Sequence, residues 1–274
     1  MTKPLPLLID SHVHVWSREP RYAFAPGAVV PEIDASAETL LKLMHENQIA
    51  RTVLIQVSHY KWDNRYLVDT LHKYPGRFSG VCRVNPEDSA APDHLSSWIE
   101  AGCRGLRLSP AADDSGDWIR GPLMKPLWKR CSELKVPMTL LLPVNRLTDV
   151  APLIEQHPEL TVVIDHMADC PVDDVLKLRQ LNAMAKYPNT FVKISHIWSL
   201  SKEQYPYRDA QAMVARVKDA FGADRLMWGT DWPIKPELLQ YAKRVALYQH
   251  DIPFFSAKEK QAMLSGTVQR VWAG

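Results

Sequence analysis

The stretch LLIDSHVHVW, residues 7–16, begins as an apolar run and ends in two histidines separated by one valine. Its start is typical of a buried strand, and side chains two apart on a strand point to the same face. We therefore expect His12 and His14 to point together from the end of the first strand. A strand that delivers polar groups at its end recurs in this sequence, and the recurrence decides the fold prediction.

Two later stretches are built in the same way. VVIDHMAD, residues 162–169, places His166 after an apolar run, and RLMWGTDWP, residues 225–233, places Asp231 after another. If these strand ends meet, both residues can converge with the two histidines of the first stretch in one pocket. Three imidazoles and a carboxylate suit a divalent metal ion or a metal-free hydrolytic site.

Short apolar runs alternate with longer amphipathic segments along the whole chain. The predicted strands are residues 7–15, 52–57, 78–84, 105–108, 138–142, 161–164, 190–194 and 226–229. The predicted helices are residues 37–47, 64–74, 93–101, 122–135, 147–157, 172–187, 208–221 and 236–250. Eight strand–helix units in about 250 residues are typical of a (β/α)₈ TIM-type barrel. We predict an α/β fold with a single barrel domain over residues 1–274 and an extra C-terminal helix, residues 256–272, packed outside it.

A doubly wound open sheet is the structural alternative. Such folds usually carry a glycine-rich phosphate-binding loop directly after the first strand. Here the corresponding turn reads DSHVHVW, residues 10–16, and contains no glycine. The missing glycines favour the barrel.

Composition excludes several classes of protein. The 274 residues are 46% hydrophobic and 23% charged, which is ordinary for a soluble protein. The net charge of +2 is too small to indicate binding to nucleic acid or to an anionic membrane surface. No apolar run approaches the roughly 20 residues that span a bilayer, and the first residues do not resemble a secretory signal. Four cysteines without a CxxC pair indicate reduced, mostly buried thiols. We expect a cytoplasmic protein that binds a small-molecule substrate, and the sequence leaves its oligomeric state open.

Polar residues gather at the predicted carboxyl ends of the strands, where barrels of this type carry their catalytic groups. The candidate catalytic residues are His12, His14, His166 and Asp231, and the candidate substrate-binding residues are Arg107, Arg83, His59 and Ser195. Arg107 has two possible roles, because a buried arginine needs an anionic partner. It would form a structural salt bridge or bind a substrate carboxylate. His166 could instead be a histidine held by Asp165. Lys193 and His196 also lie where the seventh strand ends.

These motifs resemble the amidohydrolase superfamily over nearly the whole chain. HVH after the first strand, DH after the sixth and WGTDWP after the eighth carry the resemblance, together with GLRL at residues 105–108. The pattern is most similar to the amidohydrolase-related branch that includes 2-pyrone-4,6-dicarboxylate lactonases and sugar-acid lactonases. The resemblance implies a hydrolase that opens a small lactone of the sugar-acid, muconolactone or pyrone-dicarboxylate type.

Two positions depart from the pattern of the metal-dependent members. Many of these carry a histidine at the end of the fifth strand and a carboxylated lysine on the fourth, whereas this chain has Pro143 and Asn145 at the first place and Arg107 near the second. A binuclear centre is therefore not expected. A site for one divalent ion, most simply zinc, remains possible. His12, His14 and Asp231 would hold the ion, and His166 would be a fourth ligand or a catalytic group. A metal-free mechanism, as the resemblance to pyrone-dicarboxylate lactonases implies, is equally open.

The predicted mechanism makes Asp231 the general base that activates water, with a pKa raised by burial. His12, His14 and His166 would polarise the ring carbonyl, directly or through the metal ion. Arg107, with Arg83, would bind a substrate carboxylate.

Two other functions are alternatives. The first is metal-dependent, non-oxidative decarboxylation of an aromatic or unsaturated acid, which related branches of the superfamily perform. Those decarboxylases are commonly longer and tend to keep the histidine on the fifth strand, which this chain lacks. The second alternative is a non-catalytic binding protein that retains the pocket.

Overall fold

The structure, a computed structural model, describes residues 7–110, 116–235, 237 and 239–272, which form eight strands in two parallel sheets. The first sheet has the order β1-β2-β3, with β1 (Leu8–Val13), β2 (Ile49–Ile55) and β3 (Phe78–Val81). The second has the order β4-β5-β6-β7-β8, with β4 (Leu106–Leu108), β5 (Met138–Leu140), β6 (Val162–Ile164), β7 (Thr190–Lys193) and β8 (Leu226–Met227). All eight predicted strands are present, and most end earlier than predicted.

Single bridges connect the two sheets at both of their borders. Cys82, directly after β3, pairs with Leu106 of β4, and Val13 of β1 pairs with Trp232, which follows β8. The N–H of Asp231 also donates to the carbonyl oxygen of His12 over 2.8 Å. These contacts hold the first and last strands side by side and bring residues far apart in the sequence to one place.

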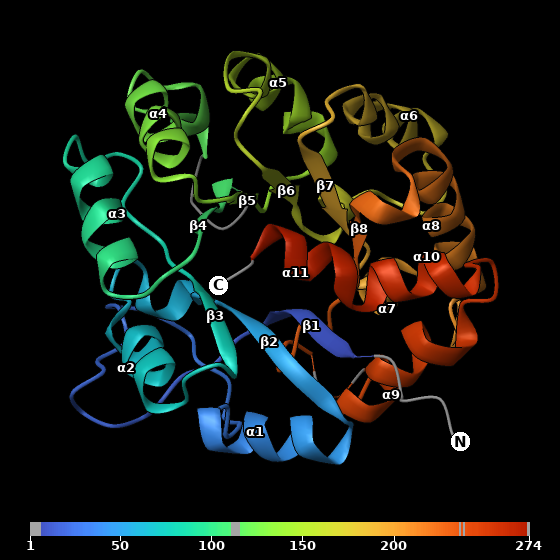
Figure 1. The fold of residues 1–274 in the computed structure, drawn as a ribbon, viewed down its shortest axis with the longest axis horizontal. Coiled ribbons are helices and arrows are strands. Elements are labelled where there is room, and N and C mark those ends of the chain that lie inside the picture. The colour runs from blue at the N-terminus through green and yellow to red at the C-terminus, as the bar shows by residue number, and fades with distance from the viewer. Residues whose placement is uncertain (1–6, 111–115, 236, 238, 273–274) are drawn as a thin grey trace.

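The helices follow the strands in sequence, and α1–α6 and α8 lie around the strands in Figure 1. Their bounds are α1 (Ala37–Glu46), α2 (Arg65–Lys73), α3 (Ala91–Glu100), α4 (Met124–Leu134), α5 (Leu147–Gln156), α6 (Val175–Ala183), α7 (Ile197–Leu200), α8 (Arg208–Phe221), α9 (Tyr241–Ala246), α10 (Ala257–Gln261) and α11 (Thr267–Val271). None of the described helices is long and apolar enough to cross a membrane.

Two helical segments differ from the prediction. The helix predicted for residues 236–250 begins at Tyr241 as α9 and widens into a π-type turn after Ala246; Pro236, its predicted first residue, lies outside the described residues. Helix α7 was not predicted, because four residues are too few for a hydrophobic period to show.

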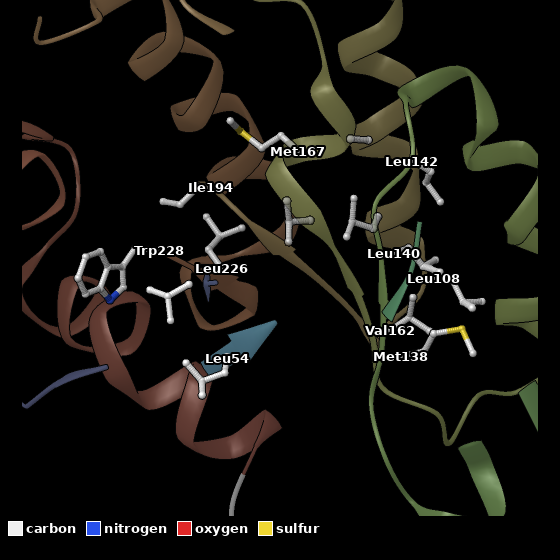
Figure 2. Packing of buried hydrophobic residues seen from close by; sticks show 14 of the residues in the cluster. Leu54, Leu108, Met138, Leu140, Leu142, Val162, Met167, Ile194, Leu226 and Trp228 are labelled. Carbon is white, nitrogen blue, oxygen red and sulfur yellow. The ribbon is translucent and has the colours of Figure 1, made fainter. Parts of the chain in front are cut away.

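The apolar core has two parts that the alternation of strand side chains separates. On β2, Leu54 belongs to the large cluster between strands and helices, whereas Val53 and Ile55 belong to a smaller cluster on the other face. Figure 2 shows side chains of the large cluster, among them Leu108 and Met138 on neighbouring strands. The four cysteines are free thiols and buried, as the sequence predicted.

The C-terminal segment corrects one prediction, because it does not pack on the outside of the fold. Val268 and Trp272 are buried in the smaller cluster together with Ile9 and Phe191, which lie near the amino ends of their strands. In Figure 1, α11 crosses in front of the strands. The apolar side chains at that end need cover from water, and the tail provides it.

Candidate active site

The structure brings the four predicted catalytic residues together around the carboxylate of Asp231. Its Oδ1 lies 3.3 Å from Nε2 of His14, 3.5 Å from Nε2 of His12 and 3.9 Å from Nε2 of His166. A further imidazole, His196, places Nδ1 2.5 Å from Oδ2. One carboxylate is thus surrounded by four imidazoles from three separate parts of the chain.

Asp10 and Gly229 explain how the first and last strands present these groups. The ladder between β1 and β2 is irregular between Asp10 and Val13, which re-aims His12 and His14. The Asp10 carboxylate accepts hydrogen bonds from the N–H and the hydroxyl of Thr230, at 2.9 and 2.5 Å, and so ties β1 to the turn before Asp231. At Gly229 any Cβ would lie 2.8 Å from the Cβ of His12, so only glycine fits there.

Backbone in the left-handed region positions the remaining groups. Residues 166–169 have φ values of 50°, 53°, 55° and 48°, and this turn directs His166 toward Asp231. Its Nδ1 lies 2.8 Å from the hydroxyl of Ser195. Asp231 itself has φ 52°, and His196 has φ 68°. Such conformations cost free energy for residues other than glycine and tend to occur at functional sites.

The hydrogen-bond partner of His14 fixes where its lone pair points. Nδ1 of His14 donates to the carbonyl oxygen of Ile55 over 2.7 Å, because a carbonyl can only accept. In this tautomer Nε2 of His14 carries a lone pair and faces Asp231. Nδ1 of His12 lies between two groups, 3.1 Å from Nζ of Lys193 and 3.3 Å from a carboxylate oxygen of Asp165.

His12, His14 and Asp231 form a set that could hold a metal ion. The two Nε2 atoms of His12 and His14 lie 3.3 Å apart, and their distances to Oδ1 of Asp231 are 3.5 and 3.3 Å. Ligands about 2.0–2.1 Å from a tetrahedral ion lie about 3.3–3.4 Å from one another. The donor set therefore fits a divalent metal. His166, His196 and Asp231, and His12, Asp165 and His166, form overlapping sets.

A cavity of about 280 Å³ opens onto these groups. Its wall contains His14, Val57, Ser58, His59, Arg107, Leu141, His166, Asp169, His196, Asp231 and Ile234. His59 and Arg107, two of the predicted substrate-binding residues, thus face the cavity. Arg83 and Ser195 are not part of its wall: the guanidinium of Arg83 stacks 4.9 Å from the ring centre of Trp62, and Ser195 contacts His166 from behind.

A second layer of charge lies beneath the histidines. The carboxylate of Asp165 is 3.1 Å from Nζ of Lys193 and accepts a hydrogen bond from Nε of Arg107 over 3.0 Å. Arg107 thus forms the salt bridge of the first alternative and also lines the cavity, while its binding of a substrate carboxylate stays a prediction. Lys193 is the last residue of β7, and His196 follows this strand by three residues. Their position at a strand end was the one signal in the sequence that pointed to them.

The pKa values differ from the sequence prediction. Burial by itself would raise the pKa of Asp231, but His166, His14 and His196 outweigh it and hold that pKa well below the ordinary value of a carboxyl group. The predicted raised pKa is thus wrong. Burial lowers the pKa of His166 to about 3, and burial and Lys193 lower that of His12. At neutral pH the site therefore combines an ionised Asp231 carboxylate with neutral imidazoles at His12 and His166.

Comparison with known proteins places this chain among the amidohydrolases, whose family model matches residues 9–273. L-fucono-1,5-lactonase of Burkholderia ambifaria is 29% identical over 237 residues, which cover 82% of this chain and 80% of the relative. A 2-pyrone-4,6-dicarboxylate hydrolase of Comamonas testosteroni is 28% identical, with 96% and 89% covered. The structure of a candidate 2-pyrone-4,6-dicarboxylic acid hydrolase from Pseudomonas putida has a TM-score of 0.82 at 26% identity, with 98% of each chain covered. The chain therefore belongs to the amidohydrolase family.

Proposed function

We propose that this protein hydrolyses a small lactone, with Asp231 as the base that activates water. The observation that carries the proposal is the position of the Asp231 carboxylate, which lies among imidazoles at the wall of a cavity large enough for a small ring. The same imidazoles hold the pKa of Asp231 low, so the carboxylate can act as a base at neutral pH. The names of the two relatives described above, a lactonase and a pyrone-dicarboxylate hydrolase, indicate enzymes that act on cyclic esters.

The reaction follows from these groups. Asp231 accepts a proton from water while the water oxygen bonds to the lactone carbonyl carbon. The ring C–O bond then breaks with its electron pair on the ring oxygen, and Asp231 returns the proton to that oxygen. One water is consumed and a hydroxy acid is formed. Because Asp231 is a weak base, much of the rate enhancement must come from the fixed positions of water and carbonyl.

Arg107 and His59 are the residues we assign to the substrate. Arg107 uses Nε for Asp165, and its Nη1 and Nη2 make no hydrogen bond to any described residue, so they can donate to substrate oxygens. His59 faces the cavity next to the ring of Trp16. Arg83 and Ser195 do not line the cavity, and we assign them an indirect role. Arg83 stacks on Trp62, and the hydroxyl of Ser195 contacts Nδ1 of His166.

A metal ion is compatible with the same residues. His12, His14 and Asp231 would hold it, with His166 beside them, and zinc is the ion that this donor set suits best. When bound, the ion would polarise the carbonyl and lower the pKa of the attacking water. Without it, the imidazoles and Arg107 stabilise the negative charge that develops on the carbonyl oxygen.

We further propose that the two sheets form one closed (β/α)₈ barrel and that residues 1–274 are a single domain. The bridges from Cys82 to Leu106 and from Val13 to Trp232 support closure at both borders. A cytoplasmic location agrees with the four buried free thiols.

The test is an acid-release assay with sugar-acid lactones, muconolactones and 2-pyrone-4,6-dicarboxylate, run with chelator and with added zinc. We expect ring opening of at least one lactone. Activity that survives chelation supports the metal-free form, and activity that needs zinc assigns His12, His14 and Asp231 as ligands. Carbon dioxide release from an aromatic acid, with no lactone opened, would contradict the proposal.

A further inference from the structure

A buried cation lies directly behind the turn that carries Asp231. Arg244 of α9 is fully buried, and its five N–H groups all donate to backbone carbonyl oxygens. Nη1 donates to Thr230 and Asp231 over 2.9 and 3.2 Å, and Nη2 to Ile234 and Lys235 over 2.6 and 2.8 Å. Nε donates to Leu239 over 2.6 Å.

This arrangement is unusual because the cation has no ion-pair partner. No carboxylate of the described chain pairs with Arg244, and its guanidinium instead stacks 4.4 Å from the ring centre of Trp198. A cation buried without a counter-ion costs free energy unless its protons are fully satisfied. Four of the five carbonyl partners belong to residues 230–235 and the fifth to Leu239, so this free energy is recovered only when these residues adopt their observed positions.

The same segment needs support of this kind. Asp231 has φ 52° and Lys235 φ 47°, conformations that non-glycine residues seldom adopt. Several carbonyl oxygens also point at one spot, where they would repel one another without a donor between them. The guanidinium removes that repulsion and fixes the peptide units on both sides of Asp231.

We propose that Arg244 is a positioning residue of the active site: its planar set of five donors holds residues 230–235 in the shape that directs the Asp231 carboxylate at the histidines. Arg244 itself is not among the residues that line the cavity. The kinetic test of this proposal rests on the proposed function. A second test, by hydrogen exchange, is independent of that function. Lysine keeps the charge but cannot bond five carbonyls in one plane, so Arg244→Lys isolates the geometry.

The matched control is Arg225, which also bonds backbone carbonyls through a guanidinium but at the opposite end of β8. It donates to Phe221, Ala185 and Tyr187 over 2.7, 3.1 and 2.9 Å. Arg225→Lys therefore removes a similar set of bonds without touching the Asp231 turn.

We expect Arg244→Lys to lower kcat about 100-fold, with KM changed much less, because displacing a reacting group by about 1 Å costs roughly that factor. Arg225→Lys should leave kcat unchanged. In an Asp231→Asn background, Arg244→Lys should cause no further loss, since it acts through Asp231. A kcat within twofold of wild type, or a loss that multiplies with that of Asp231→Asn, would overturn the proposal.

Two further measurements test the positioning role of Arg244 if the kinetics of Arg244→Lys cannot be measured. If Arg244→Lys does not fold, Trp198→Leu removes the ring on which the guanidinium stacks, together with a ring contact to His196, and should lower kcat by a smaller factor. An unchanged kcat would count against the proposal. If the wild type opens no lactone, the proposed function fails, and hydrogen exchange decides. Exchange should then rise in the segment around Asp231 for Arg244→Lys and not for Arg225→Lys, and equal protection in both variants would refute the positioning role.

Discussion

Two buried aspartates, Asp165 and Asp231, lie in consecutive layers of the same site with different neighbours. Asp165 is fully buried, 3.1 Å from the ammonium of Lys193 and 3.0 Å from Nε of Arg107. Asp231 lines the cavity, and four imidazoles surround it. In both, burial by itself would raise the pKa and the neighbours lower it far below the ordinary value.

The two aspartates differ in the chemistry that is open to their neighbours. Arg107 carries a permanent charge, and Asp165 opposes the burial that lowers the pKa of Lys193, so the charges of this layer depend on one another. The imidazoles around Asp231 are neutral where burial lowers their pKa, as for His12 and His166. They can exchange protons, bind a metal or release the carboxylate to a water molecule. The comparison supports our proposal that Asp231 is the reactive carboxylate and Asp165 the supporting one.

The largest effect should come from Asp231→Asn. The amide keeps the shape but cannot accept a proton from water, so kcat for lactone opening should fall by about 10³-fold or more. Thermal unfolding should change little, because the imidazole partners do not carry permanent charges. Asp219→Asn, at a mostly exposed side chain, is the control and should match wild type in both measurements.

Asp165→Asn should act mainly on stability. It leaves Lys193 buried with no counter-charge, and removing one partner of a buried ion pair costs about 3–5 kcal/mol. Urea unfolding should show this loss as a lower midpoint with the same slope. The double variant with Lys193→Met should recover part of it, and a single variant as stable as wild type would remove the structural role of Asp165.

Asp10 sharpens the comparison, because this third buried aspartate has only neutral donors around it. Burial raises its pKa to about 6, against the bonds from Thr230 and His12 that lower it. The folded state therefore holds this proton more tightly than the unfolded state, whose pKa is near 3.8. Stability should fall as the pH rises from about 4 to 6, by about 3 kcal/mol in total. Asp10→Asn should remove that slope in unfolding titrations, and a slope unchanged in the variant would assign it to another group.

Arg107→Lys should give the smallest effect. The ammonium still neutralises Asp165, but the free Nη donors disappear, so KM should rise about 10-fold while kcat changes less. Steady-state kinetics on the best lactone measure this, with Arg104→Lys, at an exposed side chain, as the control. An unchanged KM would show that Arg107 serves the salt bridge alone.

The sequence predicted the strands and the convergence of HVH, DH and GTDWP because strand ends of parallel sheets meet. It could not predict the partners of those groups. The bond from His196 to Asp231 depends on a left-handed turn after β7, and the link between Lys193 and Asp165 depends on the register of β6 against β7. Neither has a local signature. Arg244 had none either, since its five partners are backbone carbonyls, which every residue carries.

The position of the C-terminal tail was missed for a related reason. An amphipathic pattern shows that Val268 and Trp272 will be buried, but it does not show against which surface. The tail packs on the strand face that carries Ile9, Val53 and Phe191, because these side chains leave apolar surface there.

The most direct test of the central claim measures lactone hydrolysis per folded molecule for Asp231→Asn and Asp165→Asn side by side, each normalised to its folded fraction by urea titration. The account predicts a fully folded Asp231→Asn with about a thousandth of the wild-type rate or less, and a destabilised Asp165→Asn whose folded molecules remain active. An Asp231→Asn variant that hydrolyses the lactone at the wild-type rate would contradict it.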